Sequence, residues 1–322
     1  TDRYYHAVGS GGMATASSPA RGGASTFGNE NLKRAGIGGL ALAFRIISPV
    51  FILVALLLIG GAVNQWFLLV LPMWTTVLSP VYCVATSVGI FFIFNIVYNY
   101  AKCITVSSVY AHPDGDECGD GEADDDFRFC KHCKHVTPED SQHCFLCGQC
   151  VYDLDHHCPW IMNCVGRHNH SYFFLFLFYV TTGCLFFSGF SVPPFYSLHF
   201  RHKKFSKYQP KHLDHGMLSL SAILPLTLSV AVGAMMVWHG YLLATCQTSL
   251  EFPNNFWKKY KAYKLGNSWT HLKDRGIVRN WQTRFGVSGE RLWWILWLFP
   301  YLRTKKRGEE YRYKELRKPR TV

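Results

Sequence analysis

The chain has 322 residues, of which 49% are apolar and 17% are charged, and its formal net charge at neutral pH is +12. This length would suit one or two soluble domains, but the apolar residues are concentrated in a few long runs. An ordinary soluble protein is therefore excluded, and we expect the chain to associate with a lipid bilayer and not with nucleic acid.

Four stretches lack Asp, Glu, Lys and Arg, and each reaches the ~18–20 residues that a helix needs to cross a bilayer. A single stretch of this kind could be a buried helix of a soluble core, but four of them predict a four-span α-helical membrane protein. The first begins too late for a cleaved secretory signal and is better described as a signal-anchor. The stretches are 46–63 (extending to 71), 81–101, 171–192 and 217–245.

The basic residues predict the orientation of these spans. Segment 251–322 holds 18 Lys and Arg against 6 Asp and Glu, whereas loop 72–80 holds no basic residue. The positive-inside rule then places both termini and segment 102–170 in the cytosol. Loop 193–216 has five basic residues and would face the lumen, which argues the other way, but the basic C-terminal segment outweighs it.

Five parts follow in chain order. Residues 9–28 are mostly Gly, Ser and Ala, which cannot form a core, so the first part is expected to be disordered. The parts are a cytosolic tail (1–35), transmembrane helices 1 and 2 (36–104), a cytosolic cysteine-rich domain of short hairpins (105–170), transmembrane helices 3 and 4 with a lumenal loop (171–246), and a cytosolic C-terminal domain (247–322).

Two segments within these parts stand out by composition. Residues 113–126 include eight acidic residues, but their spacing does not fit a calcium loop, which favours a solvated linker. Residues 291–302 read RLWWILWLFPYL and are too few to span a bilayer. Tryptophans beside basic residues favour an interfacial helix in the headgroup region, and the alternative is an apolar patch docked on another part of the protein.

Seven of the twelve cysteines lie between residues 130 and 164. In the cytosol they should stay reduced, and repeated CxxC steps with interspersed histidines are typical of tetrahedral zinc sites. Two closed sites of three cysteines and one histidine would use six thiols and leave one, although the count does not say which. Cys158 alone adjoins an Asp-His-His sequence, but a spare thiol can also be a small buried apolar residue.

The spacing Cys-x2-Cys…His-Cys-x2-Cys-x2-Cys-x4-Asp-His-His-Cys-x5-Cys-x4-Asn-x3-Phe resembles the cysteine-rich domain of the DHHC protein S-acyltransferases (palmitoyltransferases). The four-span layout is similar too, and Thr248-Ser249-Leu250-Glu251 looks like the TTxE motif of that family. Asn280, in Gly276-x3-Asn280-Trp281, looks like its C-terminal asparagine motif. The TSLE variant looks most like the Abl-philin branch.

The resemblance implies a division of the ligands between two structural zinc ions. It also implies transfer of palmitate or a similar acyl group from acyl-CoA, through an S-acyl intermediate on Cys158, to cysteines of membrane-associated proteins. His156 would be the general base and Asp155 would orient it. The implied zinc ligands are Cys130, Cys133, His143 and Cys150 for the first ion, and Cys144, Cys147, His157 and Cys164 for the second.

Further residues have roles that the resemblance supports. Asn169, Thr248, Ser249, Glu251 and Asn280 would support the site. The Thr248-x-x-Glu251 spacing also fits a helix capping box; Pro253 would interrupt such a helix early, which favours a tertiary hydrogen-bonding role.

Gly183, in the third span, could leave room for the acyl chain, or it could be a helix-packing glycine. The family usually has a basic residue where this chain has Asp140, so CoA phosphates would need other partners, such as Lys131, Lys134 or Arg167.

Two other classes of function compete with the enzyme. The first is a catalytically inert, zinc-stabilised membrane scaffold in which Cys158 does not react with acyl-CoA. The second is a transporter, but the fourth span offers only His239 as an ionisable group. Family resemblance alone implies the endoplasmic reticulum or Golgi membrane, with the active site facing the cytosol.

Overall fold

The computed structural model describes residues 24–110, 127–209, 214–271 and 273–300. As predicted, four helices are long and apolar enough to cross a membrane, and the cysteine-rich hairpins lie between the second and the third. The acidic segment 113–126 lies outside the described residues. The candidate spans are Leu42–Met73, Pro80–Thr105, His170–His199 and His215–Ala244.

The first helix is longer than its membrane span. Helix α1 (Ala24–Gln65) has 42 residues and continues through a π-helical turn (Trp66–Val70) and a 3₁₀ turn (Leu71–Met73). Residues 24–35 are therefore helical, although the sequence predicts a disordered tail there, because extending an existing helix costs far less than nucleating one. The rest of that tail, residues 1–23, lies outside the described part of the chain.

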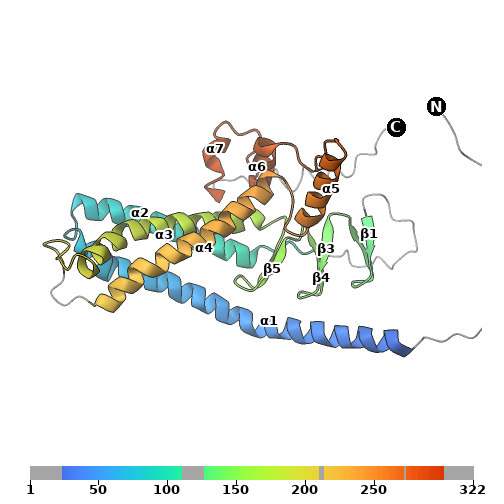
Figure 1. Cartoon of the computed structure of the whole chain (residues 1–322), viewed down its shortest axis with the longest axis horizontal. Helices are drawn as coiled ribbons and strands as arrows, with labels where there is room; N and C mark the ends of the chain where they lie inside the picture. The colour runs from blue at the N-terminus through green and yellow to red at the C-terminus, as the bar shows by residue number, and fades with distance from the viewer. Residues whose placement is uncertain (1–23, 111–126, 210–213, 272, 301–322) are drawn as a thin grey trace, which may run out of the picture.

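Three spans form the centre of the protein. Figure 1 shows α2 (Pro80–Thr105), α3 (His170–His199) and α4 (His215–Ala244) side by side, while α1 diverges from them and runs past the hairpins. Within its most apolar window, 39% of α3 is buried, against 6% for α1, so α3 is the central helix. Most outward-facing residues of the spans are apolar, which suits a lipid-facing surface.

Two spans begin with side-chain caps. Ser79 Oγ accepts a hydrogen bond from the backbone N–H of Tyr82 at 3.1 Å, and Pro80 occupies the first turn of α2, where it needs no N–H partner. Asp214 Oδ1 accepts one from the backbone N–H of Met217 at 3.0 Å and starts α4. These caps fix where the chain re-enters the span region after each connecting loop.

Three antiparallel hairpins follow α2. They pair β1 (Phe127–Cys130) with β2 (His135–Pro138), β3 (Ser141–Cys144) with β4 (Gln149–Tyr152), and β5 (His156–Cys158) with β6 (Asn163–Val165). An isolated two-stranded hairpin is only marginally stable in water. These hairpins therefore need other interactions to hold them together.

The C-terminal segment forms α5 (Phe252–Lys264), α6 (Ile277–Phe285) and α7 (Trp293–Leu296). The predicted helix at 291–302 is reduced to the four residues of α7. Trp293 and Trp297 pack on the buried cluster of Phe174 and Phe285, and Tyr179 Oη donates a hydrogen bond to the carbonyl of Leu298 at 2.8 Å. The described part of this run is thus docked on α3 and α6, which is the alternative that the sequence left open.

Gly183 lies against the neighbouring helix α2. A Cβ atom at this position would be 3.5 Å from Phe92 Cβ and 3.5 Å from Ile96 Cδ1, which is ordinary van der Waals contact. This geometry is that of a glycine at a helix–helix interface.

We therefore expect Gly183→Ala to keep the melting temperature of the purified protein close to that of the wild type. Gly183→Trp should lower the free energy of unfolding by about 1–3 kcal/mol, because a large side chain must displace Phe92 and Ile96. Thermal unfolding in detergent measures both. A stable Trp variant with a changed acyl-chain preference would instead support the cavity role.

Candidate active site and metal centres

Two of the CxxC steps, Cys130–Cys133 and Cys144–Cys147, each form a tight turn at the tip of a hairpin. The backbone N–H of Lys134 donates to the carbonyl of Cys130, and that of Gly148 donates to the carbonyl of Cys144, both at 2.8 Å. The two donor residues have φ angles of 58° and 70°, which is left-handed backbone that glycine adopts without strain. These turns bring the two sulfurs of each step to one side of the hairpin tip.

The first turn belongs to a group of four potential ligands: Cys130, Cys133, His143 and Cys150. The Nδ1 atom of His143 lies 3.7 Å from Cys130 Sγ, 3.3 Å from Cys133 Sγ and 4.0 Å from Cys150 Sγ. Tetrahedral zinc with ordinary Zn–S and Zn–N bonds needs ligand-to-ligand distances of about 3.5–3.8 Å. The four side chains therefore fit a closed zinc site.

The second group consists of Cys144, Cys147, His157 and Cys164. The Nδ1 atom of His157 lies 3.9 Å from Cys144 Sγ, 3.2 Å from Cys147 Sγ and 3.6 Å from Cys164 Sγ. Both groups have the composition that the resemblance implies. Each is a Cys₃His set that fits one zinc ion.

The hairpin of β3 and β4 supplies ligands to both groups. His143 is directly opposite Cys150 in its register, so the two point to the same face and complete the first group. Cys144, one residue further along β3, points to the other face and joins the second group with Cys147. Alternation along one short strand therefore makes the two ligand sets interleave.

Cys158 lies outside both groups. It is 6% exposed and packs in an apolar cluster that includes Tyr100 and Cys103 of α2 and Phe173 of α3. The thiol therefore lies where the metal-binding hairpins meet the transmembrane helices.

His156 and Asp155 stand beside this thiol. His156 Nδ1 is 2.7 Å from Asp155 Oδ2, and His156 and Cys158 lie two positions apart on β5, on the same face of the strand. Burial lowers the pKa of His156, but the hydrogen bonds with Asp155 and Cys158 outweigh it and raise the pKa to about 9. At neutral pH, a histidine with this pKa carries a proton on both ring nitrogens.

The TTxE-like segment completes the environment of Asp155, which is fully buried. Ser249 donates to it twice, from its backbone N–H to Oδ1 at 2.7 Å and from its hydroxyl to Oδ2 at 2.9 Å. Burial alone would raise the pKa of Asp155, but its hydrogen bond with His156 and the charges and donors around it lower the pKa well below its usual value. Asp155 is thus a fixed carboxylate.

Thr248 and Glu251 form the capping box that their spacing allows, and Glu251 also makes a tertiary ion pair with Lys273 at 2.8 Å. They form the reciprocal bonds of a capping box, with the Thr248 N–H on Glu251 Oε2 at 3.0 Å and the Glu251 N–H on Thr248 Oγ1 at 3.2 Å. The expectation that Pro253 interrupts the helix is wrong. Pro253 lies in the first turn of α5, where a missing N–H costs nothing, and α5 runs for 13 residues.

Two asparagines implied by the resemblance join separate parts of the chain. Asn169 is fully buried, donates from Nδ2 to the carbonyls of Val106 and Cys164, and accepts from the Gly166 N–H. Asn280 donates to the carbonyl of Ala244 at 2.7 Å, which ties α6 to the end of α4. Buried amides satisfied in this way hold the hairpins and the C-terminal segment to the span ends.

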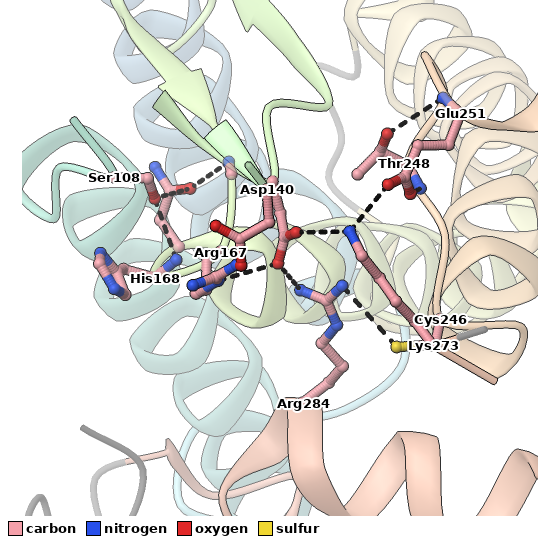
Figure 2. Close-up of polar contacts among 12 residues, drawn as sticks. Ser108, Asp140, Arg167, His168, Cys246, Thr248, Glu251, Lys273 and Arg284 are labelled. Carbon is pink, nitrogen blue, oxygen red and sulfur yellow. Dashed lines mark hydrogen bonds and ion pairs between the residues drawn. The ribbon is translucent and has the colours of Figure 1, made fainter. Parts of the chain in front are cut away.

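A cluster of ion pairs lies beside the site, and sequence reasoning missed most of it. Arg167 forms ion pairs with both Asp140 and the buried Asp153, so its charge is already compensated where the sequence offered it as a CoA partner. Lys273 and Arg284 also reach Asp153, and Figure 2 shows both basic side chains pointing to the same place as Arg167. Positions 153, 167, 273 and 284 are too far apart for any local pattern to reveal this pairing.

A histidine pair beneath the site was also missed. His170 Nε2 is 3.1 Å from His239 Nδ1, and both side chains are buried. Together with Asp155 they lie close enough to hold a metal ion. However, the two ring nitrogens face each other in a hydrogen bond, and the Asp155 oxygens already accept from Ser249 and His156, so the geometry is that of a hydrogen-bonded pair.

Comparison with known proteins gives consistent matches. Residues 123–255 match the DHHC palmitoyltransferase family. The chain is 32% identical over 193 residues to palmitoyltransferase PFA3 of Debaryomyces hansenii, an alignment that covers 56% of this chain and 45% of that protein. It is 28% identical over 221 residues to palmitoyltransferase ZDHHC16A of Danio rerio, covering 53% of this chain and 55% of that protein.

A third relative is matched over a larger share. The chain is 29% identical over 263 residues to palmitoyltransferase ZDHHC16 of Mus musculus, covering 80% of this chain and 71% of that protein. By contrast, it spans only about half the length of the first two relatives.

The interleaved ligand groups predict how zinc content responds to substitution. Cys158→Ser should retain two zinc ions per chain, because Cys158 belongs to neither group, whereas Cys133→Ser should lose metal and the folded hairpins together. Elemental analysis of the purified variants measures zinc content. Loss of one zinc from Cys158→Ser would contradict the ligand assignment.

Proposed function

We propose that the protein is a protein S-acyltransferase, because residues 123–255 match the DHHC palmitoyltransferase family. It transfers palmitate or a similar fatty acyl group from acyl-CoA to cysteines of membrane-associated proteins. One observation carries the proposal: among the seven clustered cysteines, Cys158 alone lies outside both ligand groups, and it stands beside the Asp155–His156 pair.

The reaction proceeds in two steps through Cys158. Its thiolate attacks the acyl-CoA thioester, forming an S-acyl-enzyme and releasing the CoA thiolate, which takes up a proton. The thiol of the protein substrate then attacks the acyl-enzyme and regenerates Cys158. The chain's relatives are named palmitoyltransferases, which supports palmitate as the group transferred.

His156 makes Cys158 reactive. A free cysteine is only slightly ionised at neutral pH, so a neighbouring group that takes its proton increases the fraction of thiolate. The raised pKa of His156 matches this role, because the proton then rests on the imidazole while the thiolate attacks. Asp155, held by Ser249, fixes Nδ1 of the ring, which leaves Nε2 to take the proton of the thiol.

Zinc has an architectural role. Bound to the two Cys₃His groups, zinc ions supply folding energy on the order of 10 kcal/mol each. A Zn²⁺ ion with three thiolates is a net anion and would disfavour a further thiolate close by, so activation of Cys158 falls to His156. The cages set the position of β5, on which both His156 and Cys158 lie.

The membrane brings the donor to the thiol. Cys158 packs against Tyr100, Phe173 and Leu177 of the span ends, so a fatty chain dissolved in the bilayer enters beside it. With Asp140 and Arg167 paired, the exposed Lys131 is the proposed partner of the CoA phosphates. The acceptor is a cysteine of a membrane-associated protein at the same interface.

Orientation and location are also proposed. The excess of basic residues in segment 251–322 supports cytosolic termini and a cytosolic active site, and the endoplasmic reticulum or Golgi membrane follows from the family. Within that family, the alignment with ZDHHC16, the Abl-philin, over 80% of this chain supports the Abl-philin branch.

A direct experiment distinguishes this enzyme from an inert scaffold. Purified protein incubated with palmitoyl-CoA should gain a hydroxylamine-sensitive palmitoyl adduct, and mass spectrometry should locate it on Cys158. The matched control is Cys158→Ser, which should gain none while keeping its zinc. An unlabelled Cys158 in a zinc-loaded protein would favour the scaffold.

The role of His156 predicts a distinctive pH dependence. His156→Ala should reduce Cys158 autoacylation at neutral pH by about 10²–10⁴-fold. Activity should return in part as the pH rises above the usual thiol pKa of about 8.5, because the thiol then ionises unaided. Autoacylation rates across this range measure the effect, and an unchanged rate at neutral pH would remove His156 from the mechanism.

A further inference from the structure

Asp153 is a buried carboxylate in contact with three cations. Its side chain is 1% exposed, and Oδ2 is 2.9 Å from Arg167 Nε and 3.3 Å from Arg284 Nη1, while Oδ1 is 3.1 Å from Lys273 Nζ. Figure 2 shows these three basic side chains converging from separate parts of the chain. Asp153 thus joins the link between β4 and β5 to the start of α3, to α6 and to the segment before α6.

The positive and negative charges of the residues named in this cluster balance. Its three cations face three carboxylates, those of Asp140, Asp153 and Glu251. An unpaired carboxylate is costly to bury, and the three cations offset that cost. Because no net positive charge remains within the cluster, it does not have the chemistry of a phosphate-binding site.

Lys273 extends the contacts of Asp153 to the TTxE-like segment. Its Nζ also lies 2.8 Å from Glu251 Oε1. The other oxygen of Glu251 accepts the N–H of Thr248, and the N–H of Glu251 donates to the Thr248 hydroxyl, so residues 248–251 form a closed loop. Lys273 therefore fixes the position of that loop relative to Asp153.

The same loop is hydrogen-bonded to the Asp155–His156 pair through Ser249. Ser249, inside it, donates twice to Asp155, and Asp155 holds His156 at 2.7 Å. Asp153 and Asp155 are two residues apart in one short link. The loop is consequently held at two points of that link, by Lys273 on Asp153 and by Ser249 on Asp155.

We infer that Asp153 and Lys273 are positioning residues, which hold Ser249 against Asp155 and so set the orientation of His156 beside Cys158. The inference rests on the proposed acyltransfer function. Without Lys273, residues 248–251 keep their internal hydrogen bonds but lose their attachment to Asp153. Asp155 and His156 then sample wrong orientations, although the zinc sites and Cys158 remain.

The test uses full-length protein reconstituted in lipid nanodiscs, with palmitoyl-CoA as the donor. In Lys273→Met, kcat for Cys158 autoacylation should fall about 10- to 100-fold, as expected when a catalytic group is slightly misplaced. KM for palmitoyl-CoA, zinc content and melting temperature should stay close to those of the wild type. Lys259→Met, on the exposed surface of α5, is the matched control and should behave as the wild type.

Two further variants separate positioning from a general loss of stability. Lys273→Arg keeps a cation that can reach both carboxylates and should recover most of the activity. Ser249→Ala combined with Lys273→Met should be no slower than the slower single variant, because both changes break the same connection; independent effects would multiply.

Several results would overturn the inference. They are full activity of Lys273→Met, multiplied losses in the double variant, or loss of zinc or a lowered melting temperature in Lys273→Met, since the last two would show a structural role. An inactive wild type with both zinc ions bound would instead overturn the proposed acyltransfer function, and with it the inference.

Discussion

The packing of eight metal-binding side chains into two interleaved tetrahedra is the constraint on which the rest of the structure depends. Three short hairpins have too little apolar surface to fold alone, and they share ligands across the β3–β4 hairpin. Side chains alternate between the two faces of β5, so neighbouring residues of this strand have different surroundings. His157 turns to a zinc group, while His156 and Cys158 turn to the other side, where Asp155 and the span ends lie. The ligand His157 and the pair of His156 and Cys158 thus lie on opposite faces of three consecutive residues.

The C-terminal segment contributes to the site as much as the hairpins do. Ser249 bonds to Asp155, Asn280 ties α6 to the end of α4, and the aromatic residues of α6 and α7 pack against α3. The central span α3 therefore has the hairpins at its first residues and the C-terminal segment along its side. The geometry around Asp155, His156 and Cys158 is a property of the junction between hairpins, spans and C-terminal segment, and no one of these parts contains it alone.

Patterns local in sequence predict the spans and the cysteine-rich region, because length, charge depletion and CxxC spacing are local signals, whereas the division of the ligands between two groups came from the family resemblance. They could not predict contacts between distant positions. Asp153 looks like an ordinary loop residue until Arg167, Lys273 and Arg284 are seen around it. Pro253 does not interrupt α5 because it lies in the first turn, and the sequence does not locate the start of this helix to within one turn. The sequence predicts disorder at residues 24–35 because amino-acid composition alone does not show that α1 extends through them.

The shared hairpin has a consequence for metal exchange. His143 and Cys150 serve one ion, and Cys144 and Cys147, on the same two strands and their turn, serve the other. Whichever ion binds first orders the backbone that the second ion needs, so each raises the affinity for the other by the same factor. A chelator that removes one ion loosens the cage of its neighbour, and partly demetallated chains should be scarce compared with full and empty ones.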